Sequence, residues 1–233
     1  MAYREDLAYI HDAGFTGSGP LDILRRHGVT AGLVVDLGCG SGRWAFELNR
    51  AGYDVLGVDQ SPAFIRMARR IAPLSRFRTG SLWTAKLPGC DAVTAIGECL
   101  NYAPPADPAP FFARVYAALR PGGIFVFDVA GPSRIPPGGP RRHWTEGRDW
   151  AVLVESTGDH RRNTLTRRIV SFRKVEGRYR RSQEIHHLKL YRPADLKQAL
   201  HRAGFQAEVV TAYGRVRLRE GIAGLVARKH RLT

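Results

Sequence analysis

Short apolar runs alternate with amphipathic stretches over the first 130 residues. Strands are predicted at residues 33–37, 54–58, 76–79, 91–96 and 124–127, with helices near 43–51, from 62 onward and over 108–120. Ser61 and Pro62 support the second helix, because serine favours the N-cap and proline the first helical position. Strands that alternate with helices predict a parallel sheet with helices on both faces.

The pattern changes after residue 130. Residues 131–142 are rich in proline, glycine and arginine and are predicted to form a loop or flexible lid. Two or three longer, polar strands follow between residues 150 and 191, and Glu176-Gly177 is a candidate turn between them. We therefore expect a small antiparallel insertion over residues 131–192.

The chain ends are expected to complete the domain. A helix is predicted from residue 192 until Gly204 stops it, followed by closing strands at 206–211 and 222–227. The first thirty residues are predicted to be helical. Three apolar residues there are expected core anchors: Leu21, Ile23 and Leu24.

Composition indicates one ordered domain over residues 1–233. The chain is 44% hydrophobic and 24% charged, which argues against disorder. It contains no apolar run of roughly 18 residues and no secretory pattern at its N-terminus, so no membrane partner is expected. Its three cysteines, Cys39, Cys90 and Cys99, form no C-x-x-C pair, which excludes a disulfide framework or cysteine-rich zinc site and makes a cytoplasmic location the default.

The positive charge is concentrated in the last part of the chain. The net charge is 36 − 21 = +15, and residues 131–233 contribute 23 basic and 9 acidic side chains, 23 − 9 = +14. This region is either a patch for nucleic acid or an acidic substrate, or a solvated sheet in a protein that prefers arginine.

Candidate chemistry begins at the glycine-rich turn after the first strand. Gly38, Gly40 and Gly42 form G-x-G-x-G, whereas a nicotinamide or flavin fingerprint G-x-G-x-x-G requires glycine where Arg43 stands. Asp36 precedes the turn and would repel a pyrophosphate. It suits a cationic ligand without phosphate, such as S-adenosylmethionine.

Asp59 is the second indication of a nucleoside site. It ends the second predicted strand, 59 − 36 = 23 positions after Asp36, where an acidic residue accepts hydrogen bonds from ribose hydroxyls. A helix N-cap is the alternative for Asp59, but Ser61 already fills that position. Asp36 and Asp59 together favour a ribose and disfavour a phosphate.

Several motifs in the expected order resemble those of class I S-adenosylmethionine-dependent methyltransferases. Residues 34–42, Val-Val-Asp-Leu-Gly-Cys-Gly-Ser-Gly, are similar to the first motif, and residues 58–61 to the acid of the second strand. The segments at 80–88, 91–101 and 119–123 resemble, in turn, the adenine-edge segment, the fourth strand with its exit loop, and the turn before the fifth strand. The resemblance implies an α/β, Rossmann-like, seven-stranded, mostly parallel sheet with an antiparallel β insertion before the last helix.

The resemblance also implies positions around the cofactor, S-adenosylmethionine. Gly38, Cys39 and Gly40, within the turn that Gly42 completes, would line its methionine portion, with Asp36 near the amino group. The remaining expected contacts are Asp59 on the ribose, Gln60 and Phe64 beside the adenine, Ser81 and Leu82 at the adenine edge, and Gly97 and Glu98 near the sulfonium. Phe64 alternatively packs in the core, and Glu98 is alternatively a solvated charge.

The acceptor is less clearly indicated. Adenine-amino methyltransferases carry Asp/Asn-Pro-Pro-Tyr/Phe after the fourth strand, where this chain has Gly-Glu-Cys-Leu at residues 97–100, and neither Cys90 nor Cys99 follows a proline as in cytosine-carbon enzymes. No cluster has metal-ligand spacing. The insertion resembles the small sheet over the pocket of bacterial small-molecule N-methyltransferases, which implies His186 as a candidate base or orienting group and Tyr191 as a pocket residue. Glu98, after the fourth strand, is the third catalytic candidate. A surface histidine and a core tyrosine are the alternatives.

The N-terminal residues 1–30 carry Tyr3, Tyr9, His11 and Phe15, which either fold over the cofactor as a lid or pack as an amphipathic helix on the sheet. The sequence therefore predicts methyl transfer by in-line displacement to nitrogen or oxygen of a small molecule. The alternative is an RNA or protein methyltransferase that uses the basic C-terminal region. Less favoured are a cofactor-binding protein without turnover and a nicotinamide oxidoreductase. The oligomeric state is left open.

Overall fold

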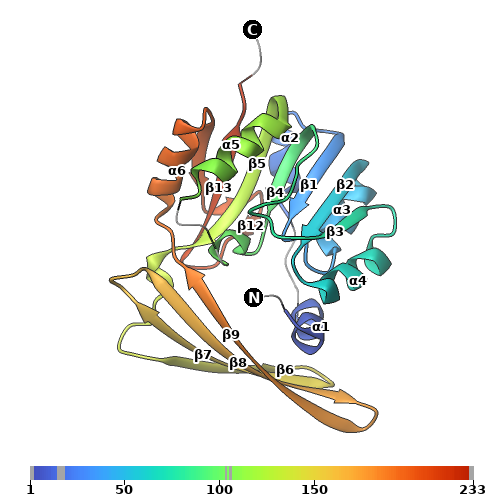
Figure 1. Cartoon of the computed structure of the whole chain (residues 1–233), viewed down its shortest axis with the longest axis vertical. Coiled ribbons are helices and arrows are strands. Elements are labelled where there is room, and N and C mark those ends of the chain that lie inside the picture. Colours follow the sequence, from blue (N-terminus) through green and yellow to red (C-terminus); the bar gives the residue numbers. More distant parts are fainter. Residues whose placement is uncertain (1–2, 15–18, 103, 105–106, 231–233) are drawn as a thin grey trace.

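The computed structural model describes residues 3–14, 19–102, 104 and 107–230. Its central sheet consists of β1 (Gly32–Leu37), β2 (Tyr53–Asp59), β3 (Arg76–Thr79), β4 (Cys90–Ala95), β5 (Leu119–Ala130), β10 (Gln206–Val210) and β13 (Ile222–Arg228). The strand order is β10-β13-β5-β4-β1-β2-β3 (Figure 1). Strands β1 to β5 are parallel, and β13 is antiparallel to both β5 and β10. This confirms the mostly parallel, seven-stranded, Rossmann-like sheet.

Helices cover both faces of this sheet, as the sequence predicted. One face carries α2 (Leu21–Arg26), α3 (Arg43–Arg50) and α4 (Pro62–Ile71), and the other carries α5 (Ala109–Ala118) and α6 (Pro193–Arg202). Successive strand residues point to opposite faces. Val34 and Val126 therefore pack in the first core, and Val35 and Phe127 in the second.

A second, antiparallel sheet lies at one end of the molecule (Figure 1). It consists of β6 (Arg141–Glu146), β7 (Trp150–Asp159), β8 (Thr164–Val175) and β9 (Arg178–Lys189), with the predicted turn at Glu176-Gly177. The prediction of a loop over 131–142 is wrong at its end, because β6 begins at Arg141. All six residues of β6 are exposed and the backbone pairs with β7, so no apolar alternation marks this strand.

Asn101 ties together the two ends of this insertion. It lies in the short helix η1 (Cys99–Asn101) and is fully buried. Its side chain accepts from the Ala130 amide at 2.9 Å and donates to the carbonyls of Ala130 and Lys189. The Tyr191 amide also donates to the Ala130 carbonyl at 3.1 Å. The inserted sheet therefore leaves and rejoins the main domain at one point.

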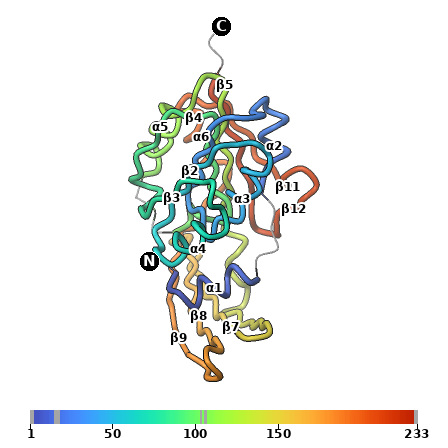
Figure 2. Tube along the Cα trace, turned by 90° about the vertical axis from the view of Figure 1, so that its right-hand side faces the viewer, coloured from blue at the N-terminus to red at the C-terminus, as the bar shows by residue number. Residues whose placement is uncertain are grey.

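The first helix, α1 (Glu5–Ala13), lies between the two sheets (Figures 1 and 2). Leu7 and Ile10 pack with Val152 and Ile169 of the antiparallel sheet, and Ala8 packs on the side of α4. The predicted lid residue Phe15 lies outside the described residues.

Two details of the chain differ from the predictions. The helix predicted through residue 120 ends at Ala118, because β5 already begins at Leu119 and pairs with Cys90. A small hairpin of β11 (Ala212–Tyr213) and β12 (Val216–Arg217) was not predicted. Within the described residues, no helix combines the length and apolarity needed to cross a bilayer.

Gly42 gives a direct test of the turn before α3. Its φ is +83°, and an added Cβ would lie 2.9 Å from the Ala68 Cα and Cβ atoms of α4. Gly52 has a similar φ of +90° but nothing within 4 Å of an added Cβ. We expect Gly52→Ala to lower the free energy of unfolding by about 1–2 kcal/mol through backbone strain alone. Gly42→Ala should lose a further ~1–3 kcal/mol through overpacking, measured by urea denaturation; equal losses would contradict this packing.

Candidate functional site

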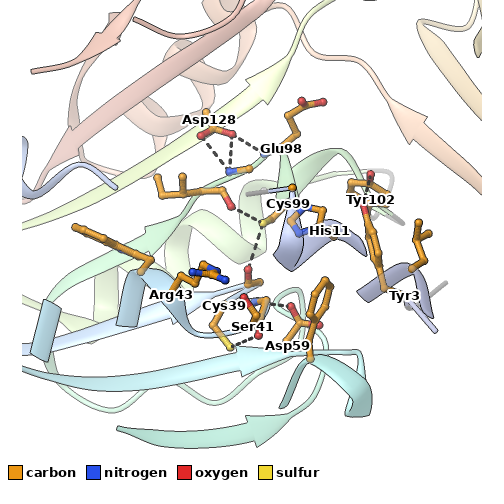
Figure 3. Close-up of a pocket in the computed structure, with 18 of the residues that line it drawn as sticks. Tyr3, His11, Cys39, Ser41, Arg43, Asp59, Glu98, Cys99, Tyr102 and Asp128 are labelled. Atoms are coloured by element: carbon orange, nitrogen blue, oxygen red, sulfur yellow. Dashed lines mark hydrogen bonds between the residues drawn. The ribbon is translucent and has the colours of Figure 1, made fainter. Parts of the chain in front are cut away.

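A cavity of about 710 Å³ opens at the carboxyl ends of the parallel strands and extends to α1 and the antiparallel sheet (Figure 3). In open α/β sheets, ligands bind at this edge where the strand order reverses, which here is between β1 and β4. The predicted cofactor residues that line the cavity are Asp36, Gly38, Cys39, Gly40, Asp59, Gln60, Phe64, Ser81, Leu82, Gly97 and Glu98. Gly42 does not line it, because Gly42 packs against α4 at the start of α3.

The glycine turn follows β1 closely. Gly38 and Gly40 have φ of +72° and +52°, so both backbones take the left-handed conformation that glycine favours. The amides of Gly38 and Cys39 donate to the Val58 carbonyl at 2.7 and 3.1 Å, which fixes the turn to β2. An added Cβ on Gly38 would strike Cys99, whereas one on Gly40 would meet nothing within 4 Å. Open space therefore begins at Gly40.

Asp36 is buried at the end of β1, with 2% of its surface exposed. Its Oδ1 accepts a hydrogen bond from Thr94 at 2.8 Å, and Thr94 in turn accepts from the Trp44 indole. Burial raises the pKa of Asp36 to about 7. The carboxyl group lacks a cationic partner among the described residues.

Asp59, at the end of β2, stabilises the turn after β1 and the turn after β2. Its Oδ2 accepts from the Gly40 amide at 3.0 Å and its Oδ1 from the Ser61 amide at 2.8 Å. Burial raises its pKa, and these hydrogen bonds act in the opposite direction. Ser61, rather than Asp59, caps α4 by accepting from the Phe64 amide, as predicted.

Asp128 of β5 is a site residue that the sequence reasoning missed. Its carboxylate accepts from the amides of Gly97 and Glu98 and from the Tyr213 hydroxyl. Burial raises its pKa to about 6. These bonds hold Gly97 and Glu98 at φ of +93° and +62°. An acidic residue near the end of an apolar strand, as at Asp36, was the signal that could have identified it.

Glu98, a predicted site residue, lines the cavity where it meets β8. Its Oε2 accepts from Nη2 of Arg167, on β8, at 3.2 Å, and both side chains are about one-fifth exposed, at 20% and 18%. Glu98 is therefore paired rather than a solvated charge. Arg167, which also lines the cavity, was not predicted.

Tyr3 and Tyr102 form a pair at the cavity wall (Figure 3). Their hydroxyls share a hydrogen bond of 3.3 Å, and the Tyr3 ring lies 5.2 Å from Phe64. Burial raises the pKa of both tyrosines, and the nearby positive charge of Arg167 opposes that effect. The sequence analysis considered Tyr3 as part of a lid or of an amphipathic helix on the sheet, and it did not identify Tyr102.

The structure does not bring His186 or Tyr191 to the cavity. His186 is buried on the inner face of β9, where its Nε2 lies 3.0 Å from Glu184 and its ring contacts Tyr3 and Tyr102. The two tyrosines separate it from the cavity, so the expected acceptor contact is corrected. Tyr191 instead packs against the main core.

α1 is attached to the glycine turn by Asp12. The Asp12 carboxylate accepts from the Ser41 hydroxyl and from the Arg43 guanidinium, with Oδ2 to Nη2 at 2.9 Å. Burial acts to raise the pKa of Asp12, but the bonds from Arg43 and Ser41 outweigh it and hold that pKa low. On the other side, Asp6 pairs with Arg173 and Arg180 of the antiparallel sheet. α1 therefore bridges the cavity's two walls.

No group of three or more histidine, cysteine or acidic side chains has the arrangement of a metal site within the part of the chain that the structure describes. Burial lowers the pKa of His11, which lines the cavity from α1. Among the described residues, the charged side chains that line the cavity are thus carboxylates and arginines.

The sequence and fold match known methyltransferases. Residues 34–123 match the family model described as a methyltransferase domain. A Geobacillus sp. (strain WCH70) protein named as a methyltransferase is 26% identical over 190 residues, 77% of this chain and 76% of that protein. A ubiquinone biosynthesis O-methyltransferase of Methylobacterium sp. (strain 4-46) is 36% identical over 128 residues, 51% of this chain and 49% of that protein.

The fold is also that of a solved methyltransferase. The S-adenosylmethionine-bound amino pentose methyltransferase CalS10 from Micromonospora echinaspora superposes with a TM-score of 0.74, 21% identity and 98% coverage of both chains. This likeness shows the fold. The matched domain, the methyltransferase relatives and the glycine turn between Asp36 and Asp59 identify the class: the chain is a class I S-adenosylmethionine-dependent methyltransferase. S-adenosylmethionine is its cofactor.

Asp36 gives a pH test of the buried site. Its folded pKa of about 7 lies above the ordinary 3.8, so its stabilising contribution is complete below about pH 4 and is lost as pH rises through 7. Asp36→Asn can still accept from Thr94 but cannot ionise. We expect the variant to gain stability over the wild type between pH 5 and pH 8, by ~2–4 kcal/mol, in urea denaturation series. A constant difference across that range would show that Asp36 does not titrate near neutrality.

Proposed function

We propose that this methyltransferase methylates nitrogen or oxygen of a small-molecule acceptor that enters beneath the antiparallel sheet. The observation that carries this proposal is that one cavity runs from the glycine turn to α1 and β7–β8. A cavity of about 710 Å³ with protein on both of these sides suits a small acceptor better than a duplex or a folded protein. An amino pentose methyltransferase and an O-methyltransferase among the similar proteins support this acceptor class.

The residues present fit the cofactor. Gly40 leaves room for a ligand to approach its backbone, since an added Cβ there meets no atom within 4 Å. Asp36 is a buried carboxyl group without a cationic partner among the described residues, which suits an amino group or sulfonium nearby. When bound, S-adenosylmethionine supplies an electrophilic methyl group that leaves a neutral thioether once the acceptor's lone pair attacks.

The chain's own residues then bind and orient the cofactor. We assign the methionine portion to the backbone of Gly38, Cys39 and Gly40, and its amino group to Asp36. The remaining assignments are Asp59 for the ribose, Gln60 and Phe64 for the adenine, Ser81 and Leu82 for the adenine edge, and Gly97 and Glu98 for the sulfonium side. Asp128 holds the Gly97–Glu98 turn.

The domain's two additions would enclose the reaction. In this proposal α1, from the segment 1–30 that the sequence predicts as a lid, covers the cofactor, whereas α2 of that segment packs on the central sheet. The insertion, residues 131–192, covers the acceptor. Excluding water and holding donor and acceptor in line are the main protein contributions to such a displacement. The methylated nitrogen or oxygen then releases one proton to solvent, which balances the transfer. The cytoplasmic location indicated by cysteine usage stays a prediction.

The ribose assignment can be tested at Asp59. Asp59→Ala removes a carboxylate that would accept two charge-assisted hydrogen bonds, so we expect S-adenosylhomocysteine affinity to fall about 10- to 100-fold. Asp54→Ala is the matched control, because Asp54 is exposed on the same strand. Isothermal titration measures both variants, with circular dichroism to verify folding. Equal affinities for the two variants would remove Asp59 from the binding site.

The lid assignment can be tested at Asp12. Asp12→Ala removes the bonds to Ser41 and Arg43, so α1 should open more often and S-adenosylhomocysteine should dissociate about 5- to 20-fold faster, consistent with the loss of roughly 1–2 kcal/mol. Glu5→Ala is the control on the same helix, because its ion pair with Arg66 is exposed at 68% and 56%. Stopped-flow displacement measures the rates. A rate unchanged by Asp12→Ala would show that α1 does not gate the cavity.

A further inference from the structure

The part of the cavity beyond the glycine turn is largely apolar. Leu7 and Ile10 of α1 face Val152 of β7 and Ile169 of β8, and all four line the cavity and form one buried cluster. Trp150 and Val154 extend this wall along β7. An acceptor placed there would bury a hydrophobic body.

Arg167 introduces a charge into this apolar wall. It lies on the same inner face of β8 as Ile169, with 18% of its side chain exposed. A guanidinium has five N–H donors, yet the described residues take only one of them, from Nη2 to Glu98. Its Nε and Nη1 atoms are not among the buried polar atoms that lack a partner. These donors are therefore open to the cavity rather than enclosed in protein.

A second donor lies beside the guanidinium. The hydroxyls of Tyr3 and Tyr102 share one hydrogen bond, so one of the two phenolic protons is still available to a ligand. Glu98 pairs with Arg167 through Oε2, and the remaining Arg167 N–H groups and the free phenolic proton beside it are donors. A fork of guanidinium donors next to a phenol is the arrangement that binds carboxylate or phosphate oxygens.

Charge balance around the cavity points the same way. Arg217 and Arg219 also line the cavity, both are exposed, and neither forms an ion pair with a described residue. Arg43, in contrast, is neutralised by Asp12. The carboxylates of the lining are Asp36, Asp59 and Asp128 at the strand ends and Glu98, which is paired with Arg167. Away from the strand ends, the unpaired charges of the lining are therefore those of Arg217 and Arg219, which favour the entry of a negatively charged molecule.

We infer that the methyl acceptor carries a compact anionic group, a carboxylate or phosphate, which binds Arg167 and the Tyr3–Tyr102 pair while its apolar body lies against Leu7, Ile10, Val152 and Ile169. This inference rests on the proposed function and narrows its acceptor class to amphipathic acids. Arg167 is then a specificity-determining residue. Arg217 and Arg219 attract the same group at the entrance.

The test uses three matched probes on the full chain saturated with S-adenosylhomocysteine. The probes are 4-aminobenzoate, 4-aminophenyl phosphate and the neutral 4-aminobenzamide, titrated by isothermal calorimetry. We expect at least one acid to bind about 10-fold or more tightly than the amide. The acid that binds better distinguishes a carboxylate from a phosphate site.

Variants at position 167 then assign the recognition to this side chain. Arg167→Gln should weaken the acid about 10- to 100-fold and leave the amide unchanged, while Arg167→Lys should restore part of the affinity because it keeps the charge without the planar fork. Arg168→Gln is the matched control, since Arg168 is exposed on the opposite face of β8 and should leave acid binding unchanged. Should Arg167→Gln fail to fold because Glu98 is left unpaired, Glu98→Gln/Arg167→Gln replaces it.

Two outcomes overturn the inference. Acids that bind no better than the amide, including no binding by any probe, would show that the wall does not select an anion. Acid binding that survives Arg167→Gln would place the anion elsewhere. The proposed function fails by a different readout, namely an absence of S-adenosylhomocysteine binding to the wild-type chain.

Discussion

Carboxylates at the ends of parallel strands organise this protein, and two of them, Asp36 and Asp128, are buried. Asp36, Asp59 and Asp128 lie at or near the ends of β1, β2 and β5, and the described residues provide no cation to pair with them. Asp59 and Asp128 instead bind backbone amides of the turns that follow β1, β2 and β4. Because burial raises their pKa values, the protein bears an electrostatic cost that a cationic cofactor relieves. In the proposed function, the same groups shape the turns and attract the cationic ligand.

The rest of the cavity is made by segments outside the central sheet. α1 is held to the glycine turn through Asp12 and to the antiparallel sheet through Asp6. His186 and Glu184 form a buried pair behind Tyr3 and Tyr102 and so support that wall without reaching the ligand space. The turns at the strand ends and the opposite wall of the cavity therefore come from different parts of one chain.

The sequence predicted the central sheet well because local signals there are strong. The apolar strands, the Ser61 cap and the glycine turn each depend on residues that are neighbours in the sequence. Nearly all the predicted cofactor residues line one cavity. What it missed depends on contacts between distant segments. In the sequence, nothing distinguishes Arg167 from the other arginines, and only the fold shows that it pairs with Glu98. Tyr102 is likewise identified only by its hydrogen bond with Tyr3, 99 positions away. His186 failed for the opposite reason, since strand alternation gave its face but not the two rings in front of it.

Asn101 has a consequence beyond its own hydrogen bonds. Asn101 donates hydrogen bonds to the carbonyls of both Ala130 and Lys189, so it fixes the distance between the two points where the inserted sheet joins the main domain. Changes in the length or the inward side chains of strands β6 to β9 would therefore leave the positions of β5 and α6 unchanged. In the proposed function, such an arrangement would allow the acceptor specificity to change within this sheet while the part of the chain that holds the methyl donor keeps its structure.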